Sequence, residues 1–253
     1  MSEPAALRRS SGGWWVDRNC RSLFPDWQAL ESLESRLVAS SSLSRVVYSR
    51  QSDEGYFIKT YQRGGGHLHD WIGTPRVAGE WRNLLYFQRL GLPVPEPVVF
   101  GVERRRGRFR RGVLVTREVP GSTDLARLAV DGDPRLRQRD WLCAVGRQVA
   151  DALARMHADR FCHGDMKWRN LLVKENGGPR VYFFDCPAGR RWRGPFLTRR
   201  RVKDLACLDK LGREHLSRTD RLRFYLRYKR LDRLTPASKR EIARIEHYFD
   251  GCR

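Results

Sequence analysis

Paired cysteines, long apolar runs and lysine are all scarce in this sequence. Its six cysteines form no Cys-x-x-Cys pair, which favours free thiols in a reducing compartment over zinc sites or disulfides. No apolar run approaches the roughly 18 residues that a membrane span requires. The first residues, MSEPAALRRSSGGWW, lack the apolar stretch of a signal peptide. We therefore expect a cytoplasmic protein.

Positive charge is what the sequence has in excess. The 50 basic residues outnumber the 29 acidic ones, and the formal net charge is +21. Such a charge indicates an anionic partner, which could be nucleic acid, an acidic membrane surface, or a phosphorylated or carboxylated substrate. Only seven of the 50 basic residues are lysine. The position of an arginine therefore says little about function in this chain, whereas the position of each lysine is informative.

The order of the patterns predicts an α+β chain with two lobes. Residues 43–61 contain two β-rich runs around the polar turn QSDEG, residues 76–90 have helical periodicity, and residues 97–103 and 112–119 read as strands. After Pro120 and Gly121 the chain is mostly helical. We expect an N-terminal extension at 1–42, a β-rich N-lobe with one helix at 43–119, and a larger helical C-lobe at 120–253.

The stretch HGDMKWRN at residues 163–170 has the composition of a phosphoryl-transfer loop. Phosphoryl transfer needs a carboxylate at the acceptor hydroxyl and oxygen ligands that hold Mg²⁺ against nucleotide phosphates. Asp165 and Asn170 supply these groups with the spacing of the protein-kinase catalytic loop. Lys167 falls where those enzymes carry a lysine that contacts the transferred phosphoryl group, and Asp185 follows one hairpin later as a second metal ligand.

The remaining parts of such a site are expected upstream. Lys59, the only lysine before Lys167, lies in the strand YFIKTY, and Glu80 lies on the next helix. These two residues match the lysine that reaches the α- and β-phosphates and the glutamate that holds it. The strand GVLVTREVPG matches the last N-lobe strand and hinge, whose main chain from Arg117 to Val119 would bind adenine.

Taken in this order, Lys59, Glu80, HGDMKWRN and the FFD that ends at Asp185 resemble the protein-kinase-like fold. Within that fold, the chain resembles the bacterial lipopolysaccharide core kinases that phosphorylate 3-deoxy-D-manno-octulosonic acid (Kdo) or heptose. The segments YQRGGG, GLPVPEPV and RRVKDLACL carry this closer likeness, which covers roughly residues 45–230.

This resemblance implies an ATP- and Mg²⁺-dependent sugar kinase acting on the inner core of lipopolysaccharide. It further implies a cytoplasmic enzyme, peripheral on the inner face of the inner membrane, with the anionic glycolipid as substrate. Asp204 in KDLACL resembles the kinase residue that braces the catalytic loop through backbone hydrogen bonds. The excess arginine would then bind the carboxylates and phosphates of the substrate and membrane.

Three departures from regulated protein kinases qualify this interpretation. No G-x-G-x-x-G precedes Lys59, so QSDEG would have to cover the phosphates with one glycine. Cys186 and Pro187 follow the metal aspartate in place of Phe-Gly, and Gly164 replaces the arginine that reads an activation-loop phosphate. A movable activation switch is therefore not expected, and the enzyme should be constitutively active.

Other functions remain open from the sequence alone. The chain could be a kinase for another small molecule or for protein, or an inactive kinase-shaped protein whose arginine surface binds membrane or nucleic acid. Runs such as RRRGRFRR and RLRFYLRYKR favour phosphate or membrane contact over nucleic acid. His67 and His69, with Asp70, are expected to face solvent or sugar rather than to hold a metal.

Overall fold

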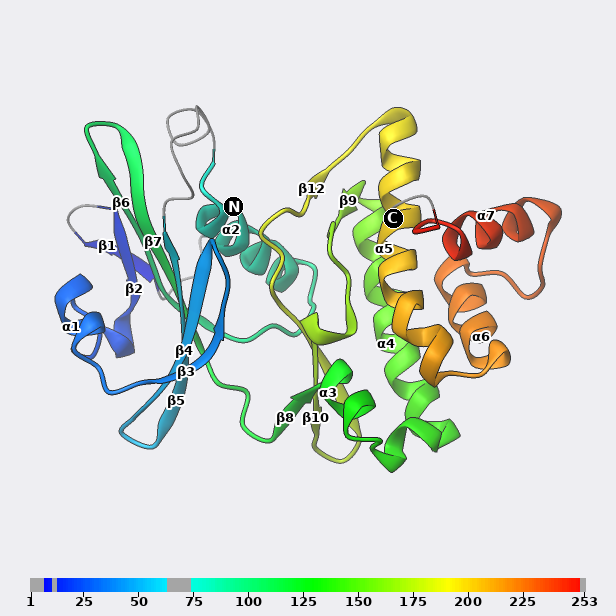
Figure 1. The fold of residues 1–253 in the computed structure, drawn as a ribbon, viewed down its shortest axis with the longest axis horizontal. Helices are drawn as coiled ribbons and strands as arrows, with labels where there is room; N and C mark the ends of the chain where they lie inside the picture. Colours follow the sequence, from blue (N-terminus) through cyan, green and yellow to red (C-terminus); the bar gives the residue numbers. More distant parts are fainter. Residues whose placement is uncertain (1–6, 11–12, 63–73, 251–253) are drawn as a thin grey trace. The chain divides into compact units, whose positions relative to one another are not determined.

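The computed structural model describes residues 7–10, 13–62 and 74–250 (Figure 1). The chain divides into two compact units, the first comprising Met1–Leu85 and Pro95–Pro120, and the second Tyr86–Val94 and Gly121–Arg253. The chain therefore passes from the first unit to the second after Leu85, within a helix, and returns to the first unit at Pro95. It passes to the second unit again after Pro120.

An antiparallel sheet of seven described strands forms the framework of the first unit, in the order β1-β2-β6-β7-β5-β4-β3. The strands are β1 Leu7–Ser10, β2 Trp14–Asp17, β3 Arg36–Ser40, β4 Ser44–Gln51, β5 Glu54–Gln62, β6 Pro97–Arg105 and β7 Arg108–Arg117. Strands β4 and β5 form the predicted hairpin. Its turn residues Ser52 and Asp53 both have positive φ angles, of 46° and 69°, as a two-residue type I′ turn requires.

Strand β5 presents different residues to the two faces of the sheet because side chains alternate along a strand. Tyr56 and Ile58 are buried in an apolar cluster with Trp14 and Val98. Lys59 follows Ile58 and therefore lies on the other face. The same alternation that buries the apolar residues thus places Lys59 on the face opposite to this cluster.

Three strands of the sheet, β1, β2 and β3, lie within residues 1–42, the range expected to form an N-terminal extension. Strand β2 pairs with β6, with Trp14 opposite Gly101, and β3 pairs with β4. Trp14 is buried because Gly101 leaves room for its ring, and a Cβ at Gly101 would collide with it. Between β2 and β3 the chain forms the short helix α1 (Trp27–Glu31).

Helix α2 (Arg76–Arg89) packs closely on β7 at Gly112. A Cβ at Gly112 would overlap the side chain of Val77, which is fully buried. Val77 lies one helical turn before Glu80 on the same side of the helix. Because Gly112 has no side chain, α2 approaches the sheet closely and brings Glu80 near it.

The second unit is mostly helical, as the sequence predicts (Figure 1). Its helices are α3 Leu125–Val130, α4 Arg139–Ala158, α5 Gly194–His215, α6 Arg218–Lys229 and α7 Pro236–Glu246, with 3-10 turns Pro134–Arg137 and Trp168–Asn170. Its strands are β8 Ser122–Asp124, β9 Phe161–Cys162, β10 Leu171–Glu175, β11 Pro179–Phe183 and β12 Arg190–Arg191. They form a three-stranded sheet, β11-β10-β8, and the pair β12-β9.

The core of this unit follows an apolar stripe along α4. Val145, Val149, Leu153 and Met156 of α4 are buried in one cluster with the residues that flank the catalytic loop. Thr235 caps α7 in a capping box with Ser238. Among the helices that the structure describes, none is both long and apolar enough to cross a membrane.

Two glycines give a matched test of the α2 packing. We expect Gly112→Ala to lower the free energy of unfolding by about 1–3 kcal/mol, because the added methyl group overpacks the contact with Val77. Gly146→Ala on α4 meets nothing within 4 Å and should be neutral or stabilising by up to about 1 kcal/mol. Urea denaturation measures both; equal midpoints for the two variants would contradict the close approach.

Candidate active site

Lys59 and Glu80 form an ion pair within the first unit, as predicted. The Lys59 Nζ atom lies 3.0 Å from Glu80 Oε2 and 3.1 Å from Oε1, so it bonds both oxygens of the carboxylate. The Glu80 side chain is only 5% exposed and that of Lys59 is 17% exposed. A carboxylate this deeply buried needs a cation, and the lysine is thereby held in a single orientation.

Tyr61 completes this arrangement and was missed by sequence reasoning. Its buried hydroxyl donates a hydrogen bond to Glu80 Oε2, and the Lys59 ammonium lies 5.2 Å from the centre of its ring. Tyr61 is two residues after Lys59 on β5, so both side chains lie on the same face of the strand. The spacing of two residues was the available signal. A tyrosine two positions after a lysine on a strand lies on the same face and so faces the same acidic residue.

The predicted adenine-binding segment follows β7. The main-chain N–H of Arg117 donates to the Glu96 carbonyl, and that of Glu118 donates to the Gly55 carbonyl. The Arg117 side chain pairs with Glu54 and Glu96. Among the described residues, the N–H of Val119 has no hydrogen-bond partner. Val119 is therefore the position in this segment whose main-chain donor is available to a ligand.

Along β4 and β5, the serine-rich β3–β4 turn lies nearer to Lys59 than does QSDEG, the turn that the sequence suggested would cover the phosphates. Lys59 pairs with Val46, only two residues from the start of β4 at Ser44, whereas the β4–β5 turn lies six residues away along β5. In the β3–β4 turn, the Ser41 hydroxyl accepts the N–H groups of Leu43 and Ser44. This turn is therefore closed by a serine hydroxyl rather than by glycines.

The catalytic-loop residues lie together within the second unit. Lys167 Nζ is 2.7 Å from Asp165 Oδ1, and Arg169 Nη2 is 3.8 Å from Oδ2 of the same carboxylate. The Asp165 side chain is 35% exposed, so the carboxylate is accessible. The Asn170 amide donates to the Asp165 main-chain carbonyl at 2.8 Å, which ties the two ends of the loop together.

The donor set at Asn170 and Asp185 suits Mg²⁺. Asn170 is 2% exposed, and since its Nδ2 is bonded inside the loop, its Oδ1 is left as the ligand atom. Asp185 has a positive φ of 53°, and the preceding Phe184 N–H donates to the Asn170 carbonyl, which links the two positions through the main chain. Amide and carboxylate oxygens are the hard ligands that Mg²⁺ prefers.

Asp204 braces this loop as the resemblance implied. It is fully buried, and its two oxygens accept the N–H groups of His163 and Gly164, each at 2.7 Å. Gly164 has a φ of 84°, a conformation that favours glycine. The start of the loop is therefore fixed by charge-assisted hydrogen bonds rather than by packing alone.

His157 and Cys162 lie close enough to Asp204 for the three to resemble a metal site. The His157 ring, however, is 2.7 Å from the Tyr228 hydroxyl through Nδ1 and 3.3 Å from Asp204 through Nε2. Burial raises the pKa of the Cys162 thiol to about 12, so it remains protonated. The group is a structural hydrogen-bond network. His67 and His69 lie outside the described residues.

The imidazole of His163, the first residue of the loop, is buried and neutral. Its ring is stacked against Phe87, with centroids 5.9 Å apart, and its Nδ1 accepts the Asp165 N–H at 3.4 Å. Burial lowers the pKa of His163, against the opposing influence of the nearby Asp204, Asp185 and Asp165. A protonated imidazole could not accept that bond, so the neutral form supports the backbone at Asp165.

Trp168 packs against the second unit's core. It is buried, and its Nε1 donates to the Leu208 carbonyl of α5 at 2.9 Å. It also lines a mainly apolar cavity of about 940 Å³, together with Leu171. The catalytic loop thus rests on an apolar wall, while Asp165 and Lys167 face away from it toward solvent.

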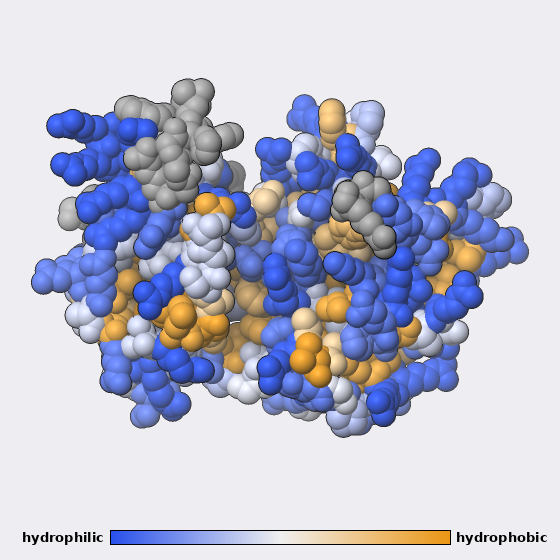
Figure 2. Space-filling model, viewed as in Figure 1, coloured by the Kyte–Doolittle hydropathy of each residue, from blue (hydrophilic) through white to orange (hydrophobic). Residues whose placement is uncertain are grey.

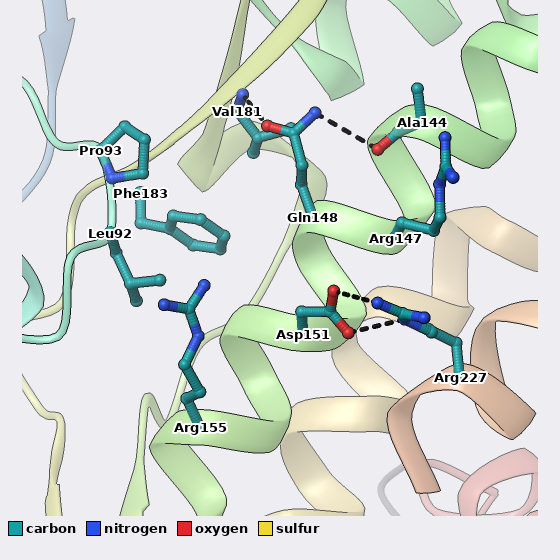
Figure 3. A pocket seen from close by; sticks show the side chains of 10 residues that line it. All are labelled: Leu92, Pro93, Ala144, Arg147, Gln148, Asp151, Arg155, Val181, Phe183 and Arg227. Atoms are coloured by element: carbon teal, nitrogen blue, oxygen red, sulfur yellow. Dashed lines mark hydrogen bonds and ion pairs between the residues drawn. The ribbon is translucent and has the colours of Figure 1, made fainter. Parts of the chain in front are cut away.

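A second cavity, of about 380 Å³, lies beside α4 (Figure 3). In Figure 3 the Asp151 carboxylate points at Arg227, and the Gln148 amide reaches between Ala144 and Val181. None of the residues that line this cavity is one of the predicted site residues.

Comparisons with known proteins agree on one family. Residues 28–228 match the sequence model of the family described as "Lipopolysaccharide kinase (Kdo/WaaP) family". A relative named 3-deoxy-D-manno-octulosonic acid kinase, from Pasteurella multocida (strain Pm70), is 26% identical over 184 residues, covering 66% of this chain and 74% of the relative. One of the same name from Actinobacillus succinogenes (strain ATCC 55618 / DSM 22257 / CCUG 43843 / 130Z) is 29% identical over 126 residues, 47% of this chain and 50% of the relative.

The fold is likewise shared with a solved structure, titled "WaaP in complex with acyl carrier protein". It superposes with a TM-score of 0.71 at 21% identity, covering 93% of this chain and 95% of that chain. The expected α+β, kinase-like two-lobed fold is thereby confirmed.

The buried neutral His163 predicts a loss of stability in mild acid. Because its pKa is lower in the folded chain than the ordinary 6.5, the unfolded chain binds a proton more readily as the pH falls below that value. Stability present above about pH 6.5 should then fall by up to about 1.4 kcal/mol per pH unit for this one proton.

Thermal denaturation at about pH 7.5 and about pH 5.5 measures this effect. In His163→Gln the difference between the two conditions should shrink, since glutamine can accept the Asp165 N–H but does not titrate. An undiminished pH dependence in the variant would assign it to other groups.

Proposed function

The chain belongs to the lipopolysaccharide kinase (Kdo/WaaP) family, and from this premise we propose a mechanism in which Asp165 directs the γ-phosphoryl group of ATP to a hydroxyl of Kdo or heptose. Family membership makes the chain a phosphotransferase that acts on a sugar of the lipopolysaccharide inner core. The single observation that carries the site assignment is the loop in which Asp165, Lys167 and Asn170 are bonded to one another.

Asp165 takes the role of positioning residue and proton acceptor for the sugar hydroxyl. As the hydroxyl oxygen forms its bond to the γ-phosphorus, its proton passes to the carboxylate, and the bond to ADP breaks. Lys167, now 2.7 Å from that carboxylate, carries the positive charge that offsets the charge on the transferred phosphoryl group. Arg169, exposed beside the same carboxylate, is placed to contact the acceptor.

Residues of the first unit bind the phosphates and the adenine of the nucleotide. Lys59 holds the α- and β-phosphates, in the orientation that Glu80 and Tyr61 impose on it. The Val119 main chain and the Arg117 carbonyl bind adenine, and the serine-rich β3–β4 turn covers the phosphates. Asn170 and Asp185 of the second unit would hold Mg²⁺, which neutralises phosphate charge when bound.

The site is built without a movable switch. Cys186 is fully buried, and its thiol donates to the His163 carbonyl at 3.5 Å, so the residue after Asp185 is tied to the catalytic loop. Gly164 has no side chain that could read a phosphorylated segment. We infer that the enzyme is constitutively active.

Kdo is favoured over heptose as the acceptor because both curated relatives named above are Kdo kinases. The acceptor sugar is part of an anionic glycolipid, so the enzyme would work as a peripheral protein at the cytoplasmic face of the inner membrane. Family membership disfavours the alternatives left open by the sequence, namely a protein or other small-molecule kinase and an inactive binding module.

Replacement of one oxygen tests the role of Asp165. We expect Asp165→Asn to lower kcat for transfer from ATP to a Kdo-containing core oligosaccharide by about 10²–10⁴-fold, because the proton acceptor is lost. Mass spectrometry of the oligosaccharide and release of ADP measure the transfer.

Asp151→Asn is the matched control, since Asp151 of α4 pairs with Arg227 of α6 and contacts no predicted site residue. It should keep the wild-type rate. A thermal shift with ATP and Mg²⁺ should persist in both variants. Near-wild-type transfer by Asp165→Asn would refute the assigned role.

A further inference from the structure

An exposed cluster of arginine and aromatic residues follows the metal aspartate, at β12 and the beginning of α5. We define this basic–aromatic patch by residues Arg190, Trp192, Arg193, Phe196, Arg199 and Arg200. Its base is fixed, since β12 pairs with β9 and the Trp192 N–H donates to the Arg160 carbonyl at 2.9 Å. Around the beginning of α5, Figure 2 shows hydrophilic side chains about a small apolar spot.

The positive charge of this patch is not neutralised. From Pro187 to Lys203 the sequence contains no acidic residue. Two further arginines of the segment are used within the fold, since Arg191 pairs with Asp159 and Arg201 donates to the His157 carbonyl. The four arginines of the patch form no ion pair with any residue that the structure describes.

Arginines on α6 contrast with this. Arg221 pairs with Asp209 and Glu246, Arg223 pairs with Asp220, and Arg227 pairs with Asp151. These three arginines are therefore balanced by acids of the same unit. The arginines of the basic–aromatic patch are therefore available to bind an anionic partner outside the protein.

The aromatic residues of the patch are held where that partner would meet them. Arg190 and Arg200 lie over the Trp192 ring, with 4.0 and 4.5 Å between the guanidinium carbon and the ring centre. Phe196 is 64% exposed, although it is large and apolar. An exposed phenylalanine ring among unpaired cations adds no stability in water, whereas the transfer of the ring into a lipid interface lowers the free energy.

We propose that the basic–aromatic patch is the surface by which this enzyme docks on an anionic bilayer. Phe196 enters the headgroup region, Trp192 lies at the interface, and the four arginines contact lipid phosphates. The inference rests on the proposed function only in that the acceptor is a glycolipid. The docking itself requires neither ATP nor acceptor.

A bilayer fits this surface better than a soluble anion does. None of the residues that define the patch lines either of the cavities described above, so it offers no enclosed site for one sugar or phosphate group. An extended array of cations around a protruding apolar ring instead matches the layered chemistry of a membrane surface. Docking through α5 also ties the membrane contact to the helix that carries Asp204 and hence to the catalytic loop.

Vesicle sedimentation tests the proposal with the full chain. Wild-type protein should bind vesicles of equal parts phosphatidylglycerol and phosphatidylethanolamine, with affinity that falls as salt is added, and should not bind phosphatidylcholine vesicles. The triple variant Arg190→Gln, Arg193→Gln, Arg199→Gln should lose about fivefold in affinity per arginine, about a hundredfold in all. Phe196→Ser should lose several-fold, in a manner that salt does not alter.

Matched controls carry the same changes elsewhere. The triple variant Arg233→Gln, Lys239→Gln, Arg240→Gln removes equal charge from exposed positions near α7, and Val130→Ser removes an apolar side chain that is 80% exposed. Both should bind anionic vesicles within about twofold of the wild type. Equal losses in the two triple variants would overturn the proposal, because net charge alone would then account for binding.

Activity separates this proposal from the proposed function. With a soluble, deacylated core oligosaccharide, the patch variants should transfer phosphate at the wild-type rate, and with the acceptor embedded in anionic vesicles they should be slower. Equal loss with both acceptors would show that the patch reads the sugar rather than the membrane, and would overturn the docking assignment. Vesicle binding without any phosphotransfer would refute the proposed function but not the docking.

Discussion

The catalytic loop of this protein depends on one buried carboxylate. Asp204 has no exposed surface, and a charge in that position is tolerated only because each of its oxygens accepts a main-chain N–H from the loop. Release of His163 and Gly164 would leave the charge uncompensated, so the loop and the carboxylate hold each other in place. Asp165 and Asn170 acquire their positions from this constraint, because they follow directly in the same rigid turn.

The first unit applies the same rule to a different group. Glu80 is buried, and Lys59 and Tyr61 satisfy it. In both units a buried acid therefore orients a group that we propose acts on phosphate: a lysine in one case and a backbone loop in the other. The close approach of α2 to Gly112 and the packing of Trp168 against α5 support these two positions. Fixed polar groups of this kind suit phosphoryl transfer, where catalysis consists largely of positioning and charge stabilisation.

The sequence revealed those parts of the site whose residue types are rare or whose spacing is rigid. Lys59 was identifiable because lysine is scarce in this chain, and the loop because the interval from Asp165 to Asn170 is fixed by the turn that their hydrogen bond closes. Tyr61 was not identified, because its spacing of two residues from Lys59 was the only signal and its bond to Glu80 depends on the tertiary contact between a strand and a helix. Strands β1 to β3 escaped notice since they are short, and β2 also relies on pairing with the distant strand β6.

The central claim is that this chain places a phosphate on the lipopolysaccharide core by means of the Asp165 loop. The most direct measurement is mass spectrometry of lipopolysaccharide from the host strain without this gene, complemented with the wild type or with Asp165→Asn. The account predicts a core that lacks one phosphoryl group in the deletion strain, restored by the wild type and not by the variant. An unchanged core in the deletion strain, or full restoration by Asp165→Asn, would contradict it.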